Sequence, residues 1–126
     1  MLKRLIILST WLISAGLICL YAADITGKWT AEFDTQVGLQ KYVFEFKADG
    51  DKLTGRALAN IAGAPSESDI QEGEISGDEI SFVEVQNYQG QQVKIVYKGK
   101  ISGNEINFKR TVADMIDEEF VAQRAQ

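Results

Sequence analysis

Two charged residues interrupt otherwise apolar alternations at matching places in the sequence. Glu84 continues a two-residue alternation that begins at Ile80, and Arg110 continues one that begins at Ile106. Residues two apart lie on the same face of a strand, so both charges are expected to point toward an apolar interior. A charge there is costly unless it is paired or hydrated. The pattern predicts a polar ligand anchor, a purely structural ion pair, or two strand ends in solvent.

As a ligand anchor, Arg110 would bind a carboxylate or hydroxyl and Glu84 would accept hydrogen bonds from donors. Aromatic residues at inward positions could line the same cavity. The candidates are Phe33, Tyr42, Tyr97 and Phe120. Such side chains also fill small barrels completely, so the sequence leaves open whether the interior is hollow or packed.

The residue types present exclude several kinds of chemistry. The chain has no histidine and one cysteine, Cys19, so the usual zinc, haem and copper ligands and the Ser-His and Cys-His triads are missing. No cofactor and no metal site is predicted. Carboxylates are plentiful, which leaves open a calcium site or a hydrolase using Glu84 and a second acid. The run 117–119, Asp-Glu-Glu, is expected to be an exposed charge run.

The first residues have the layout of a secretory signal. Lys3 and Arg4 precede an uncharged run over 5–21, and Ala22 and Ala23 offer small residues for cleavage. We therefore expect a signal peptide over 1–22, a domain over 23–126, and a secreted or periplasmic protein with no membrane span after cleavage. The 13 basic residues fall to 11 without Lys3 and Arg4, and 11 minus 18 acidic residues gives −7. Such an acidic domain disfavours nucleic acid as a partner.

From residue 27 onward the dominant period is two, which is typical of strands with one buried face. Glycine beside Asp or Asn marks three tight hairpin turns, and the segment 73–82 is repeated at 99–108. Together these signals predict an all-β fold, an eight-stranded antiparallel up-and-down barrel, with a two-sheet sandwich as the alternative. The expected strands are 27–34, 41–48, 52–60, 68–76, 79–86, 92–101, 105–111 and 118–125.

The connections between these strands predict two unlike barrel ends. Tight turns follow every second strand, whereas longer loops are expected elsewhere. Because alternate connections of an up-and-down barrel lie at opposite ends, the longer loops would surround one end, the natural mouth of a pocket. The expected loops are 35–40, 62–67, 87–91 and 112–117.

Gly27-Lys28-Trp29 opens the first strand, and Arg124 lies near the end of the last. This combination resembles the calycin superfamily of lipocalins, fatty-acid-binding proteins and avidins. The resemblance implies that Gly27 and Trp29 begin the barrel and that Arg124 packs across the tryptophan. The stretch from Thr26 to Gly55 is also similar to small secreted bacterial domains.

These observations favour a non-catalytic binding module for a small amphipathic or saccharide-like ligand at the looped end. One alternative is an accessory protein with a packed core, whose partner is another envelope protein. A carbohydrate-active hydrolase is the other alternative.

Overall fold

The computed structural model describes residues 24–125, and the predicted signal peptide and its cleavage sites lie outside these residues. The described part has no helix that could cross a membrane. Its regular structure is entirely β: β1 (Gly27–Thr35), β2 (Gly38–Asp49), β3 (Lys52–Ile61), β4 (Ala64–Asp69), β5 (Gln71–Ser76), β6 (Glu79–Tyr88), β7 (Gln91–Ser102), β8 (Glu105–Val112) and β9 (Ile116–Arg124).

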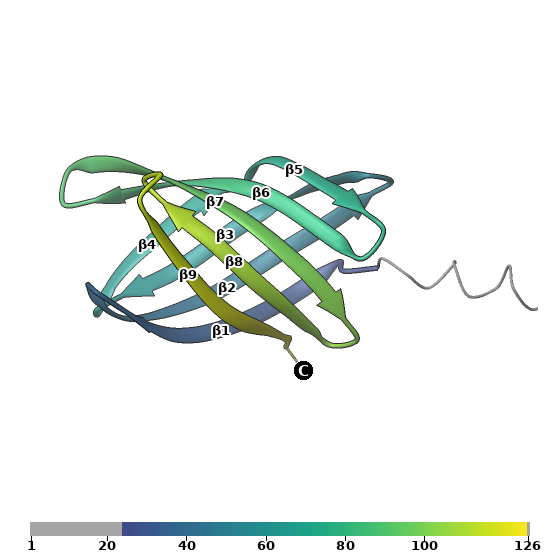
Figure 1. Cartoon of the computed structure of the whole chain (residues 1–126), viewed down its shortest axis with the longest axis horizontal. Coiled ribbons are helices and arrows are strands. Elements are labelled where there is room, and N and C mark those ends of the chain that lie inside the picture. Colours follow the sequence, from purple (N-terminus) through teal and green to yellow (C-terminus); the bar gives the residue numbers. More distant parts are fainter. Residues whose placement is uncertain (1–23, 126) are drawn as a thin grey trace, which may run out of the picture.

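These strands form the predicted closed eight-stranded antiparallel barrel, with β4 and β5 as two segments of one wall strand (Figure 1). Consecutive strands pair around the wall, and β1 closes the ring against β9 through Trp29↔Arg124 and Thr30↔Gln123. The fold therefore confirms the all-β prediction and excludes the sandwich alternative. Burial alternates along β2, β7 and β9 as expected for a wall with one inward face.

The fourth wall strand is broken where the sequence changes phase. Ile70 separates β4 from β5, and Glu72 has a φ of 53°. The pairing of β5 with β6 shifts register between Gln71 and Glu74, which is a β-bulge beside Gly73. A Cβ on Gly73 would collide with the backbone carbonyl of Leu53, so glycine permits β5 to approach β3 here.

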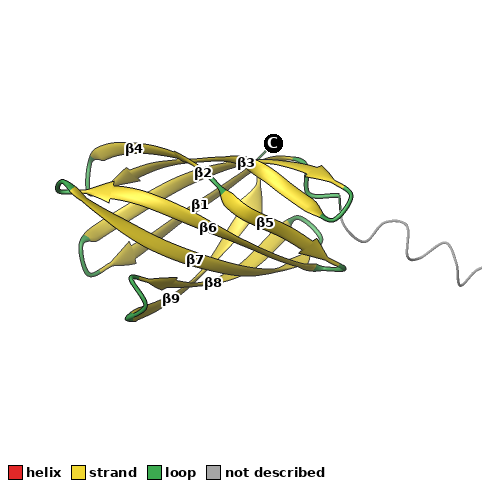
Figure 2. Cartoon of the chain, turned by 90° about the horizontal axis from the view of Figure 1, so that it is seen from above, coloured by secondary structure: helices red, strands yellow, loops and turns green. Residues whose placement is uncertain are grey.

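The break leaves a stretch of the described barrel wall, between β4 and β6, without backbone pairing; this stretch is called here the seam. Among the described residues, β4 pairs only with β3, and the part of β6 from Glu84 to Tyr88 pairs only with β7. Figure 2 shows β4 diverging from β6 on one side of the barrel. Ser68 of β4 crosses the seam, since its hydroxyl donates a hydrogen bond to Glu84 Oε2 at 3.1 Å.

Both barrel ends carry short turns, so the four longer loops predicted at one end are wrong. At that end, called here the open end, the turns span only 36–37, 62–63, 89–90 and 113–115. Ala62 and Gln89 adopt φ values of 51° and 52° immediately before glycine, which gives tight hairpins without an Asn or Asp signal. The opposite end, with turns 50–51, 77–78 and 103–104, is called the closed end.

An aromatic cluster fills the middle of the barrel. Phe44 lies at its centre, with ring centroids 5.9 Å from Phe82, 5.8 Å from Tyr97 and 5.6 Å from Phe108. A Cβ on Gly99 would lie 2.7 Å from Phe108, so this glycine makes room for the ring and not for a ligand. The interior is therefore packed through its middle.

Trp29 and Arg124 close the other end of the interior. The Arg124 guanidinium lies 4.4 Å from the centroid of the Trp29 ring, and the indole N–H donates to the Ile25 carbonyl at 2.9 Å. Arg124 also donates to the backbone carbonyls of Asp24 and Thr26, at 3.0 Å and 3.2 Å. Through these hydrogen bonds, Arg124 holds the segment before β1 across the closed end of the barrel.

We expect Arg124→Ala to lower the free energy of unfolding by about 1 to 2 kcal/mol, because a cation–π contact and several hydrogen bonds are lost. Urea denaturation followed by tryptophan fluorescence measures this change. Gln123→Ala is the control, since Gln123 is the exposed neighbour on the outer face of β9. Equal stabilities for the two variants would contradict the role given to Arg124.

Candidate functional site

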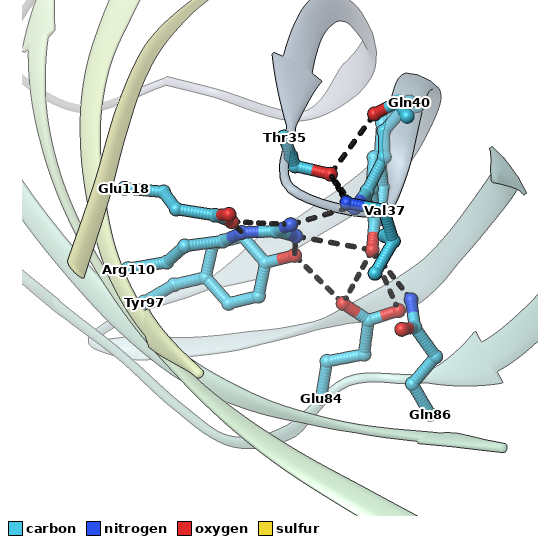
Figure 3. Close-up of polar contacts among 10 residues, drawn as sticks. Thr35, Val37, Gln40, Glu84, Gln86, Tyr97, Arg110 and Glu118 are labelled. Carbon is cyan, nitrogen blue, oxygen red and sulfur yellow. Dashed lines mark hydrogen bonds and ion pairs between the residues drawn. The ribbon is translucent and has the colours of Figure 1, made fainter. Parts of the chain in front are cut away.

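Glu84 and Arg110 both point into the barrel (Figure 3), and each follows a buried phenylalanine by two residues along its strand. Their exposed fractions are 0% and 1%, so neither is a strand end in solvent. β6 positions Glu84, and β8 positions Arg110, through the same inward alternation that buries Phe82 and Phe108. The two charges belong to one network, although no direct hydrogen bond or ion pair joins them within the described part of the chain.

Two tyrosine hydroxyls join the carboxylate to the guanidinium. Tyr97 donates to Glu84 Oε1 at 2.7 Å and accepts from Arg110 Nη1 at 2.8 Å. Tyr42 donates to the same carboxylate at 3.1 Å and accepts from Nη1 at 3.2 Å. Because each hydroxyl accepts a hydrogen bond from Arg110, its own O–H bond points toward Glu84. The buried charges stabilise each other through these oriented dipoles.

The remaining donors of Arg110 are directed toward the open end. Nε donates to Glu118 Oε1 at 2.8 Å, and Nη2 lies 2.7 Å from the same oxygen. Nη2 also donates to Gln40 Oε1 at 3.0 Å. The Gln40 amide in turn donates to the Thr35 hydroxyl at 3.0 Å. Every side-chain polar atom that is fully buried in the described residues has a partner.

Four aromatic rings also lie close to the guanidinium of Arg110. Phe33 and Phe120 stack with their centroids 4.1 Å apart, and Arg110 Cζ lies 4.8 Å from the Phe33 centroid. Arg110 also lies over Tyr42 and Tyr97, at 5.5 Å and 5.7 Å. The four aromatics predicted to line a cavity thus surround Arg110, where cation–π attraction adds to the hydrogen bonds.

The environment shifts the pKa values of three of these groups. Burial, followed by the Glu84 charge, raises the pKa of Tyr42 to about 12 and raises that of Tyr97 well above its ordinary value. Burial lowers the pKa of Arg110, but Tyr97, Tyr42 and the hydrogen bond to Glu118 outweigh it, so the net shift is upward. At neutral pH both phenols are protonated and the guanidinium is charged.

A small cavity lies between this network and the solvent at the open end. Its volume is about 120 Å³. Its polar lining is formed by Thr35, Gln36, Gln40, Gln86, Arg110 and Glu118. The rest of the lining is mainly apolar: Val37, Tyr88, Val93, Ile95, Val112 and Ile116. The hollow is therefore amphipathic, with side chains of both characters facing the same space.

Two further depressions lie outside the barrel interior. One of about 300 Å³ borders the seam near the open end, between the turn at 62–63 and the end of β6, and shares Tyr88 with the small cavity. Another, of about 440 Å³, lies on the wall of β5 to β8 near the closed end, lined by Ser81, Lys98 and Lys100 among others. The second is broad and exposed, and it does not include the network residues.

Four network residues were missed by the sequence analysis, and the same alternation could have found them. Gln40 is in phase with Tyr42, and Gln86 is in phase with Glu84. Ser68 precedes Ile70 by two. Glu118 was expected to be exposed within an acidic run, and this is wrong, because it precedes Phe120 by two and lies inward against Arg110.

The arrangement limits what chemistry the site can perform. Glu84 has no exposed surface and does not line the cavity, and its carboxylate already accepts hydrogen bonds from Tyr42, Tyr97 and Ser68. A substrate at the open end would therefore not reach it. Within residues 24–125, no three acidic residues gather in a way that could hold a metal ion. The accessible chemistry is hydrogen bonding and apolar contact at the cavity.

Comparison with known proteins adds no assignment. No protein-family model matches the chain, and no curated protein or solved structure gives a significant match to it.

The raised tyrosine pKa values predict that the fold loses stability at alkaline pH. Between about pH 10, where an unfolded tyrosine ionises, and about pH 12, the unfolded chain releases protons that folded Tyr42 retains. Stability is thus fully present below pH 10 and falls above it, by about 2 to 3 kcal/mol from Tyr42 alone. Urea denaturation at successive pH values measures the fall.

Tyr42→Phe should flatten this alkaline fall, because its contribution to the proton release disappears. Tyr88→Phe is the matched control, since Tyr88 lies at the open end outside the network and leaves it intact. A Tyr42→Phe protein with the same dependence on pH as the control would contradict the assigned coupling.

Proposed function

We propose that this protein is a secreted or periplasmic binding module of calycin-like type that takes a small amphipathic ligand in the cavity at the open end. The observation that carries the proposal is the lining of this cavity, which combines polar amide, carboxylate and guanidinium groups with aliphatic side chains. Such a combination suits a ligand with one polar and one apolar part. The contact between Arg124 and Trp29 supports the resemblance to calycins.

The size of the cavity favours a compact ligand over a saccharide. An apolar cavity of about 150 Å³ in another protein holds benzene, so a volume of 120 Å³ suits about five or six heavy atoms. A hexose has about twelve heavy atoms, roughly twice that number. A longer ligand would have to extend past Tyr88 toward the depression beside the seam.

The packed middle of the barrel supports a second candidate, an accessory protein that binds a partner through its outer surface. The unpaired edge of β4 is the exposed backbone on which such a partner could add a strand. However, β4 carries Pro65 and Glu67, and proline and charge on an edge disfavour pairing with another chain. The cavity is therefore the better-supported site.

Titration with n-pentanol, observed by amide NMR, tests the proposal. We expect saturable shifts of the Gln40 and Gln86 side-chain amides, with a dissociation constant on the order of a millimolar, about 4 kcal/mol for six heavy atoms. Val93→Phe should abolish the shifts by filling the cavity, whereas Val96→Phe on the outer face of β7 should retain them. Shifts that do not saturate, or that survive Val93→Phe, would refute the pocket.

A further inference from the structure

The N–H groups of Arg110 are all occupied by hydrogen bonds within the network. A guanidinium has five N–H groups. Those on Nη1 contact the two tyrosine hydroxyls, and those on Nη2 and Nε contact Gln40 and Glu118. A ligand carboxylate could bind Arg110 only by displacing one of these buried partners. The residue that first suggests an anion site is therefore already saturated.

Glu118 and Gln86 each bring an acceptor atom to the cavity, which the exposed Gln36 side chain also lines. Glu118 Oε1 accepts from Arg110, whereas Oε2 has no hydrogen-bond partner among residues 24–125, and the side chain is 16% exposed. Gln86 donates through Nε2 to Tyr42 at 2.8 Å, and its carbonyl oxygen is likewise without a partner in the described part. Both residues line the cavity. An incoming group that donates hydrogen bonds would find partners on both.

The charges of the network point in the same direction. Arg110 contributes +1, while Glu84 and Glu118 contribute −1 each, so the sum is −1. Tyr42 and Tyr97 are neutral at physiological pH, and burial moves their pKa values still further above it. A bound carboxylate would bring a second negative charge into a partly buried site, at a cost that a neutral or cationic group avoids.

We propose that the ligand of this cavity is a small amphiphile whose head group donates hydrogen bonds, an amine or an alcohol, and not a carboxylate. The inference rests on the proposed function and specifies its ligand class. The head group lies against Glu118 Oε2 and Gln86 Oε1, and the apolar part lies among Val93, Val112 and Ile116.

Three probes of five carbon atoms each test the head group: n-pentylamine, n-pentanol and pentanoate. Amide NMR titration at pH 7 should show the amine and the alcohol each binding at least about tenfold more tightly than pentanoate, a difference of about 1.4 kcal/mol. Pentanoate binding as tightly as either of the other two overturns the inference and leaves the pocket standing. Absence of saturable shifts with all three overturns the proposed function itself.

Glu118→Gln provides the second arm of the experiment. Removing this charge takes the network sum from −1 to 0, so the preference for pentylamine over pentanoate should shrink at least several-fold. Glu119→Gln removes the same charge from the exposed neighbouring residue on β9 and should leave the preference unchanged. An unchanged preference in a folded Glu118→Gln protein, verified by its amide spectrum, overturns the assignment of Glu118 as the acceptor.

Discussion

The half of this barrel nearest the open end depends on two buried charges, Arg110 and Glu84. They stabilise each other through hydrogen bonds to the hydroxyls of Tyr42 and Tyr97. Neither charge could be buried alone, because desolvation of an unpaired ion costs several kcal/mol. The two phenols solve this problem by donating to the carboxylate and accepting from the guanidinium. The network therefore requires four side chains from four strands to meet within hydrogen-bond distance, which restricts how those strands can pair.

This polar layer also marks where the packed interior of the barrel ends. On one side of it, Phe44 and its aromatic neighbours fill the interior, and Trp29 with Arg124 packed on its ring covers the closed end. On the other side of it, at the open end, lies the small cavity. The network thus separates a packed core from an accessible hollow, and its outer atoms give the hollow its polar lining.

Two-residue alternation sufficed to predict the barrel and the inward direction of Glu84 and Arg110. It failed where the evidence lay in backbone conformation or in long-range packing. The hairpins at Ala62 and Gln89 need positive φ from residues that rarely adopt it, so their turns looked like loops. Glu118 looked exposed because its acidic neighbours obscured its alternation with Phe120. That Tyr42 would contact Glu84, which lies 42 residues away, follows only from closure of the ring.

A double-mutant cycle between Glu84 and Arg110 tests the central claim most directly. Glu84→Gln and Arg110→Met each remove one charge while keeping most of the volume, and the free energy of unfolding is measured for both single variants and the double variant. Transmission through the tyrosines predicts that the double variant is more stable than the sum of the single losses implies, by about 1 kcal/mol or more. Losses that add to within about 0.3 kcal/mol would show that the two charges are not coupled.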